Sequence, residues 1–363
     1  MFRLRFLLAV LCLAPALPAQ TEKPVRIAIA GLVHGHVDGF LLRPAQSRKD
    51  IQIVGIFEPN LTLAQTVAKR YNLPDSLFYT NLGRMLDKVN ADAVAVFTNT
   101  FDHASVVEIA AAHHLPVMME KPMAVSMEHA KRIQSAADRY GVPVVVDYET
   151  SWYNTNRAIF DLFNNRKSAG AIRRMVAMDG HQGPEEIGVG PNFLAFLQDP
   201  HQNGAGALFD FGCYGANLMT WLMDNARPIS VEATTQQIKP QIYPNVDDEA
   251  TVILQYPKAQ GIIEASWNWP FARKDLEVYG ETGYAIATGG NSMRVRLGDQ
   301  KEETVTPEPQ SPDQRDALSY FIAVVRGKRK PAGLSSVDNN MIVTEILDAA
   351  RESARTGKRV MLQ

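Results

Sequence analysis

Two short stretches of the sequence carry side chains that could bind a hydroxyl group and transfer its proton. In the first stretch, Lys121 follows the apolar run Pro116–Met119, so we expect it just past the carboxyl end of a strand. α/β folds place their ligands at this end of the strands. A lysine there can hydrogen-bond a substrate hydroxyl and polarise it, although an ordinary solvated loop lysine fits the same pattern.

The second stretch, Gly204–Tyr214, mixes small residues with one carboxylate and one phenol. We expect it to lie in a helix over Ala205–Met223, where Asp210 and Tyr214 share a face because they are four residues apart. Beside the ammonium group of Lys121, the pKa of Tyr214 would fall, and the phenol could act as a general acid or base. The alternative for Tyr214 is a core aromatic residue with a satisfied hydroxyl.

The elements that must position these side chains begin with Val25–Ala30. This apolar run is rich in β-branched residues and predicts a buried parallel strand. Gly31 ends the strand, and we expect a helix over Val37–Ser47. A strand, a glycine turn and a helix form the first phosphate-binding unit of a dinucleotide fold, because the helix N-terminus offers free N–H groups and a positive dipole end.

The turn Gly31–His36 departs from the dinucleotide fingerprint G-x-G-x-x-G. Val33 stands in place of the second glycine and His36 in place of the third, while Gly35 could take over part of their role in a shifted turn. An ordinary turn between a strand and a helix is the alternative. His34 and His36 are two residues apart and do not face each other on a helix. We therefore expect no metal site here.

A second apolar strand is expected over Ile51–Phe57, and Glu58 follows it directly. An acidic residue at the end of the second strand accepts hydrogen bonds from the ribose hydroxyls of an adenosine. It also repels a 2′-phosphate, so Glu58 favours NAD over NADP. A surface carboxylate in a loop is the alternative for Glu58.

Short apolar strands alternate with helices up to residue 147, which predicts an α/β fold with a doubly wound parallel sheet. After residue 148 the strands alternate in polarity or contain aromatic residues and are joined by short turns. This pattern predicts an α+β domain with an open, mostly antiparallel sheet. The expected organisation is a signal peptide at 1–19, a dinucleotide-binding domain at 24–147 and a substrate and oligomerisation domain at 148–363, whose final helices pack back on the first domain.

Composition excludes several classes of protein. The formal net charge of −2 gives no electrostatic footprint for nucleic acid, and no internal stretch is apolar enough to span a bilayer. Residues 1–19 combine a positive start, an apolar run and a small residue, Ala19, which predicts a Sec-type signal peptide and export to the periplasm. An uncleaved anchor is the alternative. After cleavage only Cys213 remains, so no disulfide can form within the mature chain.

Other polar and aromatic side chains could line a substrate pocket. We expect His181 and Trp152 to contact substrate, with His103 and His201 as further polar candidates. The histidines lack the spacing of a metal site. Packing in the core is the alternative for Trp152.

These motifs, in this order, resemble the glucose–fructose oxidoreductase / inositol dehydrogenase (Gfo/Idh/MocA) family over nearly all of the mature chain. The most specific are Glu120-Lys121-Pro122 and the segment Gly206–Tyr214, whose tyrosine is typical of one branch of the family. The resemblance implies an N-terminal Rossmann domain and a C-terminal domain whose open sheet forms homodimers or homotetramers. It also implies that Lys121, Asp210 and Tyr214 are the catalytic residues, with Tyr214 as the acid/base assisted by Lys121.

The resemblance further implies a set of cofactor-binding residues, namely Gly31, Val33, His34, Gly35, His36, Glu58, Thr98, Asn99, His103, Glu120 and Lys121. We therefore expect an NAD(P)-dependent oxidoreductase that acts on a sugar or polyol, with NAD favoured by Glu58. Because free cofactor is scarce outside the cytosol, a tightly held cofactor would be recycled. The alternatives are a glycosidase that uses bound NAD in a transient redox cycle and a non-catalytic periplasmic sugar-binding protein.

Overall fold

The computed structural model describes residues 22–43 and 47–362. The expected signal peptide, residues 1–19, lies outside the described residues, and so does part of the helix expected over Val37–Ser47. In the described chain, no helix combines the length and the apolar character that a membrane crossing requires.

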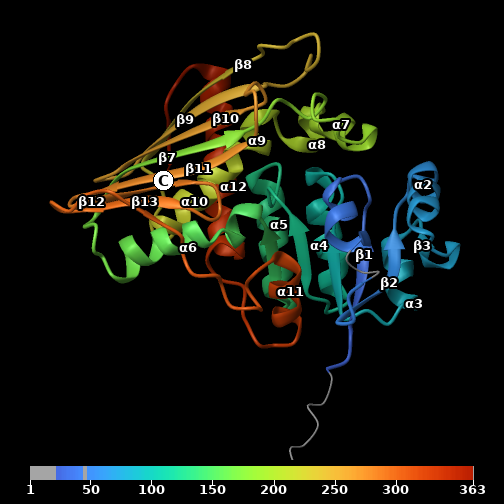
Figure 1. The fold of residues 1–363 in the computed structure, drawn as a ribbon. Helices are drawn as coiled ribbons and strands as arrows, with labels where there is room; N and C mark the ends of the chain where they lie inside the picture. The colour runs from blue at the N-terminus through green and yellow to red at the C-terminus, as the bar shows by residue number, and fades with distance from the viewer. Residues whose placement is uncertain (1–21, 44–46, 363) are drawn as a thin grey trace, which may run out of the picture.

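Six parallel strands of the described chain form the first sheet. They are β1 (Val25–Ala30), β2 (Ile51–Phe57), β3 (Phe78–Tyr79), β4 (Ala93–Val96), β5 (Val117–Glu120) and β6 (Val144–Asp147). Their order across the sheet is β3-β2-β1-β4-β5-β6, so the predicted doubly wound sheet is confirmed (Figure 1). The strand order reverses between β1 and β4, and a ligand crevice opens at the carboxyl ends there.

Helices cover both faces of this sheet. They are η1 (Asp38–Leu42), α2 (Leu61–Tyr71), η2 (Asp75–Leu77), α3 (Leu82–Lys88), η3 (Thr100–Asp102), α4 (His103–Ala112) and α5 (Met127–Tyr140). Successive side chains of a strand point to opposite faces. Accordingly, Ile27 and Ile29 of β1 belong to the buried cluster that contains Leu41, whereas Ala28 and Ala30 belong to the cluster that contains α4 and α5.

Nine strands of the described chain form the second sheet. They are β7 (Ile172–Gly180), β8 (Ser230–Gln236), β9 (Glu249–Gln255), β10 (Gln260–Ser266), β11 (Arg273–Gly280), β12 (Gly283–Thr288), β13 (Met293–Leu297), β14 (Glu303–Val305) and β15 (Val360–Met361). Their order is β14-β13-β12-β11-β7-β10-β9-β8-β15, and every neighbouring pair is antiparallel except β7 and β10. The mostly antiparallel sheet is therefore confirmed.

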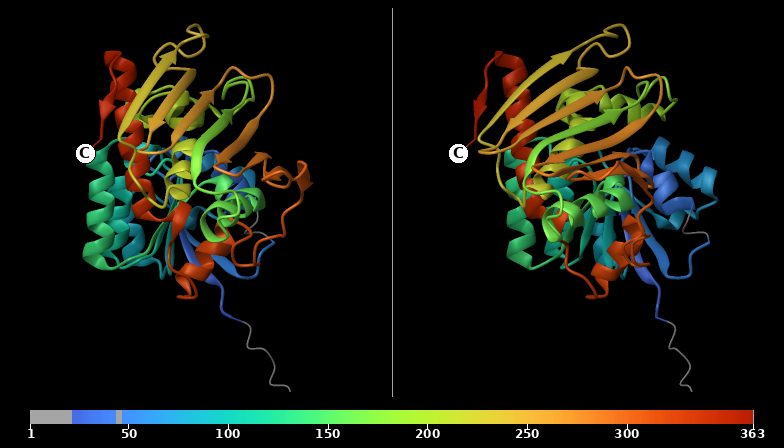
Figure 2. Two further views of the ribbon diagram at one scale, coloured as in Figure 1. Left: turned by 90° about the vertical axis from the view of Figure 1, so that its left-hand side faces the viewer. Right: turned by 60° about the vertical axis from the view of Figure 1, so that its left-hand side comes forward.

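The other helices follow the first domain in the chain. They are η4 (Glu149–Trp152), α6 (Asn154–Phe160), η5 (Asp161–Asn165), α7 (Pro191–Leu197), α8 (Pro200–Asn203), α9 (Ala207–Asp210), α10 (Gly212–Leu222), α11 (Ala317–Val325), η6 (Gly333–Ser335) and α12 (Val337–Thr356). Helices α9, α10 and α12 pack against the large sheet on the side of the first domain (Figure 2).

The last two long helices also contact the first domain. Phe321 of α11 lies in the same buried cluster as Ile27 of β1. Asp348 of α12 accepts a hydrogen bond at 2.7 Å from the backbone N–H of Met127, the first residue of α5. Helix α12 thus lies between the large sheet and α5 (Figure 1).

Two helix predictions are wrong in their bounds. The helix expected over Ala205–Met223 is split at Phe211 into α9 and α10. The sequence also predicts a helix over Asp313–Arg326, but this helix begins at Ala317, because the Asp316 carboxylate caps it by accepting the Ser319 N–H at 2.7 Å. Helix α7 was not predicted, although its Gly190 N-cap and leading proline are signals for it.

Candidate active site

A continuous groove runs along the carboxyl edge of the first sheet and consists of three adjoining cavities. The Glu58 cavity, of about 560 Å³, shares Val33 and Asn60 with the Arg70 cavity, of about 600 Å³. The Arg70 cavity shares Gly35 and Phe193 with the Tyr214 cavity, of about 450 Å³. Each volume lies in the range of small-molecule sites, so the groove can hold an extended ligand of two linked halves.

Gly31 makes the start of this groove possible. Its φ is +87°, and a Cβ atom there would lie 2.5 Å from Cγ2 of Thr98, which follows β4 closely. Only glycine allows this approach and this backbone conformation. Gly31, Thr98 and Asn99, which the family resemblance assigns to cofactor binding, therefore line the Glu58 cavity together.

The Glu58 carboxylate is held beneath the turn. It accepts hydrogen bonds from the backbone N–H of Leu32 at 2.8 Å and of Asn60 at 2.9 Å. Burial raises the pKa of Glu58, while these two backbone donors oppose that shift. Glu58 lines the Glu58 cavity, where its carboxylate could accept hydrogen bonds from the hydroxyls of a ribose.

The altered turn still offers backbone donors to an anion. Among the described residues, the N–H groups of Val33 and Gly35 have no hydrogen-bond acceptor, whereas the His34 N–H is bonded to Phe97 O at 2.9 Å. Val33 and Gly35 both line the groove between its two ends. Unpaired N–H groups at the start of a helix bind phosphate, so the groove fits a dinucleotide with its pyrophosphate at this turn.

Four of the predicted residues, His103, Glu120, Trp152 and His201, do not line the three cavities. His103 is buried, and its Nδ1 lies 3.2 Å from Met123 O. Burial lowers the pKa of His103 to about 4, so this neutral ring supports the segment around Lys121 from below. Trp152 donates its indole N–H to Asp147 at 2.8 Å and packs on Tyr320 of α11, with ring centroids 5.4 Å apart.

The centre of the Tyr214 cavity is a buried ion pair between Lys121 and Asp210. Nζ of Lys121 lies 2.6 Å from Oδ1 of Asp210 and 2.8 Å from the Asp210 carbonyl oxygen. The indole of Trp267, which is fully buried, donates to the other carboxylate oxygen, Oδ2, at 3.0 Å. The carboxylate is thereby fixed from two sides.

The split between α9 and α10 creates this pair. In a continuous helix the Tyr214 N–H would bond to the Asp210 carbonyl, but here it bonds to Phe211 O at 3.0 Å. The freed Asp210 carbonyl accepts from Lys121 and from the Cys213 thiol, at 3.3 Å. Sequence reasoning placed Asp210 and Tyr214 on one helix face, which is wrong, yet both residues do line one cavity.

Charge fixes the protonation states of the pair. Burial disfavours both charges, but the attraction between them is larger. This attraction raises the pKa of Lys121 and lowers the pKa of Asp210 to about 2. Lys121 is therefore a permanent ammonium group, with two of its three N–H donors directed at Asp210 and one left for a ligand.

Tyr214 lies between two ammonium groups. Nζ of Lys121 and Nζ of Lys274 each lie 4.9 Å from the centre of its ring. Sequence analysis expects Lys121 to lower the pKa of Tyr214, but burial raises it well above the usual value. The phenol is thus protonated at neutral pH, the form in which it can donate a proton.

His181 is placed in the Tyr214 cavity as the sequence predicts. Its Nδ1 accepts a hydrogen bond from the Gly183 N–H at 2.9 Å. Burial lowers the pKa of His181, so the ring is neutral and carries its proton on Nε2. This N–H is a second donor for a ligand in the cavity.

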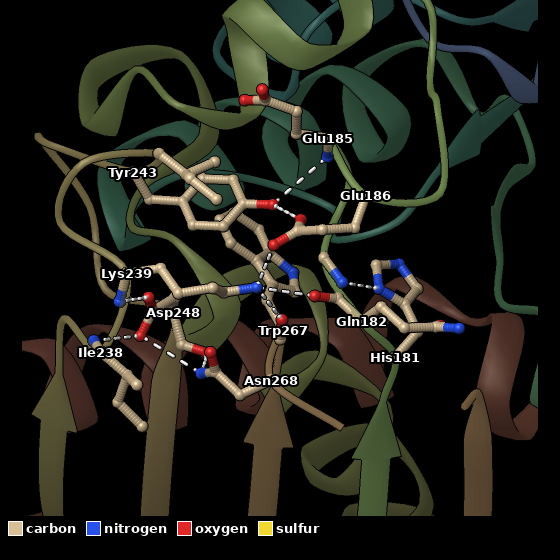
Figure 3. Close-up of polar contacts among 12 residues, drawn as sticks. His181, Gln182, Glu185, Glu186, Ile238, Lys239, Tyr243, Asp248, Trp267 and Asn268 are labelled. Atoms are coloured by element: carbon tan, nitrogen blue, oxygen red, sulfur yellow. Dashed lines mark hydrogen bonds and ion pairs between the residues drawn. The ribbon is translucent and has the colours of Figure 1, made fainter. Parts of the chain in front are cut away.

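A loop over residues 182–190 covers the Tyr214 cavity and is fastened by Lys239 (Figure 3). Nζ of Lys239 donates to Gln182 O at 2.7 Å and to Trp267 O at 2.6 Å, and it also pairs with the Glu186 carboxylate. The Tyr243 hydroxyl donates to the same carboxylate. Lys239 therefore connects the loop to Trp267, the residue whose indole holds the Asp210 carboxylate.

His34, His36 and Glu120 form a cluster beside Lys121. Nδ1 of His36 lies 3.1 Å and Nε2 of His34 lies 3.9 Å from the Glu120 carboxylate. Burial lowers the pKa of His34 to about 3. Burial disfavours the Glu120 charge too, but the neighbouring histidines outweigh it and lower the pKa of Glu120 to about 2.

Sequence reasoning missed Lys274, Phe193 and the hydrogen bond of Trp267. Lys274 pairs with Asp179 across β7 and β11, and this register turns it toward Tyr214. Phe193 of α7 packs on His34, with ring centroids 4.4 Å apart, and closes the groove over Gly35. Lys274 lies in β11, directly before the buried residues Asp275 and Leu276, so the local sequence offered only a weak signal for it.

Comparisons with known proteins agree with this geometry. Residues 25–148 match the family described as oxidoreductase family, NAD-binding Rossmann fold, and residues 165–286 match the GFO/IDH/MocA C-terminal domain. The chain is 23% identical over 313 residues to trans-1,2-dihydrobenzene-1,2-diol dehydrogenase of Xenopus laevis, covering 84% of this chain and 90% of that protein.

Two solved structures share the fold at low identity. An aldose–aldose oxidoreductase from Caulobacter crescentus, complexed with glycerol, has a TM-score of 0.78 at 21% identity and covers 94% of this chain and 100% of that one. An inositol dehydrogenase homologue from Azotobacter vinelandii, complexed with NAD⁺, has a TM-score of 0.79 at 17% identity and covers 94% and 98%. With both of its family domains matched, this chain belongs to the Gfo/Idh/MocA family of oxidoreductases, which bind a nicotinamide dinucleotide on a Rossmann fold.

Proposed function

We propose that this protein transfers a hydride between a nicotinamide dinucleotide in the groove and a hydroxyl or carbonyl carbon of a sugar or polyol. The observation that carries the proposal is the buried Lys121–Asp210 pair beneath Tyr214, at the opposite end of the groove from Glu58. The names of the relatives support the substrate class, since one is named for a cyclic diol, one for aldoses and one as a homologue of inositol dehydrogenase.

The cofactor would lie with its adenosine ribose at Glu58 and its pyrophosphate at the free N–H groups of Val33 and Gly35. Because Glu58 is a buried carboxylate, it favours the ribose hydroxyls of NAD over the 2′-phosphate of NADP. The nicotinamide half would then reach the Tyr214 cavity, which also receives the substrate. When bound, the dinucleotide supplies the hydride chemistry.

The residues of the chain orient the substrate and move its proton. The remaining N–H of Lys121 and the Nε2–H of His181 donate to the substrate oxygen. Tyr214, protonated at neutral pH, gives its proton to the oxygen of a carbonyl as that carbon is reduced. In the opposite direction Tyr214 takes the proton back, and the ammonium groups of Lys121 and Lys274 stabilise the phenolate.

Kinetics of the Tyr214→Phe variant test this proposal. The full chain is assayed with NAD⁺ and NADP⁺ against a panel of aldoses, inositols and other polyols, following the nicotinamide absorbance. Tyr214→Phe should lower turnover by roughly 10²–10⁴-fold, the usual contribution of a general acid or base. Tyr148→Phe is the matched control, because Tyr148 is buried, packs on Tyr214 and has a hydroxyl without a partner in the described chain. Equal turnover of the two variants would remove Tyr214 from proton transfer.

We also propose that the protein is exported and that the large sheet mediates assembly. Helices α9, α10 and α12 cover one face of that sheet, and the half-exposed side chains of Ile253, Ile262 and Tyr279 lie on its strands. Light scattering of the full chain tests assembly as a dimer or tetramer, and cell fractionation with and without residues 1–19 tests export.

A further inference from the structure

Three metal-binding side chains converge beside the Tyr214 cavity. His34 and His36 come from the turn after β1, and Glu120 is the last residue of β5. One potential ligand atom from each residue lies within 4.8 Å of the others. Adjacent carboxyl ends of a parallel sheet thus bring two imidazoles and one carboxylate to a single point.

The sequence argument against a metal site assumed that His34 and His36 lie on a helix. The structure places His34 in the turn, before the first helical residues, so the rule for helix faces does not apply to this pair. The third ligand comes from a strand more than eighty residues later and has no counterpart in the local spacing. The expectation of no metal site therefore loses its physical basis.

The separations fit a small divalent ion. Zinc binds imidazole nitrogen and carboxylate oxygen at about 2.0–2.2 Å in tetrahedral geometry, which sets neighbouring ligand atoms roughly 3.4 Å apart. Nδ1 of His36 lies 3.1 Å from Oε1 of Glu120, and Nε2 of His34 lies 3.9 Å from Oε2. Two histidines and one carboxylate are also the donor set that open zinc and iron sites use.

The surroundings hold the ligands and leave an entrance. His34 and Glu120 are each 3% exposed, and the His34 ring packs against Phe193 and Phe196 with centroids 4.4 and 6.0 Å away. The His36 side chain is half exposed, which gives an ion a path. His34 and His36 line the Tyr214 cavity, so a fourth coordination position would face the cavity that contains Lys121 and Asp210.

Without an ion, imidazole protons satisfy the Glu120 carboxylate. Nδ1 of His36 is at hydrogen-bond distance from it, whereas Nε2 of His34 at 3.9 Å is too far for a full hydrogen bond. On the other side of the His34 ring, the backbone N–H of His36 lies 3.4 Å from Nδ1. This contact is long for a hydrogen bond, so it fixes the tautomer of His34 weakly. A divalent ion would displace the proton that His36 directs at Glu120 and release it, whereas neutral His34 would keep its proton on the ring nitrogen that does not bind the ion.

We propose that His34, His36 and Glu120 bind a divalent transition metal, Zn²⁺ foremost, with an open coordination position toward the Tyr214 cavity. An oxygen of a ligand in that cavity, hydroxyl or carboxylate, can occupy the open position. The ion would lie at the end of the groove where the nicotinamide half is expected, so Zn²⁺ and dinucleotide compete for the protein.

The test is a Zn²⁺ titration of the full chain, freed of metal by a chelator and containing no dinucleotide, followed by calorimetry. Co²⁺ serves as a second probe, since its visible absorption reports the geometry of its ligands. The wild type should bind one ion per chain and release protons. His36→Gln should weaken binding by more than about tenfold, because even changes outside the first coordination sphere of metal sites cost roughly 10–100-fold.

His113→Gln is the matched control. His113 and Asp87 form a pair with the same 3.1 Å separation as His36 and Glu120, but no third ligand joins them among the described residues. This variant should bind Zn²⁺ like the wild type. The proposal is overturned if the wild type binds no ion, or if His36→Gln and the wild type titrate alike.

Glu120→Gln extends the test to the buried ligand, with the circular dichroism spectrum as its check on folding. The half-exposed His36 keeps the proposal testable if that variant does not fold. Metal stoichiometry is measured without cofactor, so a failure of the proposed oxidoreductase function leaves this result standing. A separate NAD⁺ titration at saturating Zn²⁺ should show weaker dinucleotide binding than the metal-free protein, and equal affinities would contradict the competition.

Discussion

The indole N–H of Trp267 donates to Oδ2 of Asp210 at 3.0 Å, while the carbonyl of the same residue accepts from Lys239 at 2.6 Å. One buried residue therefore holds both the carboxylate of the candidate active site and the lysine that fastens the loop over it. Figure 3 shows the contact between Trp267 and Lys239. The position of Asp210 and the closure of the cavity are coupled through two hydrogen bonds.

Trp267→Phe should lower turnover while the fold is retained. The variant removes one hydrogen bond to a buried charged group, which costs about 1–3 kcal/mol. If that loss falls on the transition state, the rate drops roughly 5- to 150-fold. Trp269→Phe is the control, because Trp269 also follows β10 closely and, in the described part of the chain, makes no hydrogen bond to Asp210. Similar turnover in both variants would show that the indole does not position Asp210.

Lys121→Met should abolish activity and destabilise the protein. It leaves Asp210 charged and buried without its partner, and breaking a buried pair in this way costs about 3–5 kcal/mol. Adding Asp210→Asn removes the stranded charge, so the double variant should regain much of its stability but none of its activity. Urea unfolding and steady-state kinetics of both variants check this. Full activity in the single variant would exclude Lys121 from the chemistry.

Glu58→Ala should shift the cofactor preference toward NADP. The variant removes the carboxylate that repels a 2′-phosphate, together with its hydrogen bonds to the N–H groups of Leu32 and Asn60. The measurement is the ratio of kcat/KM for NAD⁺ and NADP⁺. Glu58→Gln separates the two effects, since it removes the charge and keeps an acceptor. An unchanged ratio in both variants would place the ribose elsewhere.

Asp147→Asn should stabilise the protein more at pH 8 than at pH 5. Burial, and then the nearby charge of Glu120, raise the pKa of Asp147 to about 7. The folded state thus keeps a proton that the unfolded chain releases near pH 4, and stability falls as pH rises between these two values. Replacement by Asn removes this loss.

Urea unfolding of the wild type and Asp147→Asn at both pH values makes the comparison. Asp138→Asn, on the exposed side of α5, is the control for a change of net charge. A stability difference that does not grow with pH would mean that Asp147 is ionised in the folded protein.

The local sequence predicts the strands of this fold well. Val25–Ala30 is found as β1 with the predicted bounds, because a short, mostly apolar run with β-branched residues, ended by Gly31, has few other solutions in a buried sheet. Gly31 and Glu58 were placed correctly for a similar reason, since each adjoins the end of such a strand. The Gfo/Idh/MocA resemblance, carried by short motifs, is confirmed by the family matches.

The details of the site depend on partners that are distant in sequence. The break at Phe211 leaves the Asp210 carbonyl without a helix partner, and the group that bonds to it, Nζ of Lys121, lies 89 residues earlier in the chain. The pKa of Tyr214 rises rather than falls because the whole side chain is buried. Neither the burial of a single tyrosine nor the register that turns Lys274 toward it can be obtained from local periodicity.

The central claim is that the altered turn at Val33 and Gly35 still holds a nicotinamide dinucleotide beside Lys121 and Tyr214. Equilibrium dialysis of the metal-free protein against equal amounts of NAD⁺ and NADP⁺, with mass spectrometry of both sides, tests it most directly. We predict enrichment on the protein side of about one dinucleotide per chain, NAD⁺ before NADP⁺, because the groove presents free N–H donors and Glu58. Enrichment of neither dinucleotide would contradict the account and favour a protein that binds its ligand without redox chemistry.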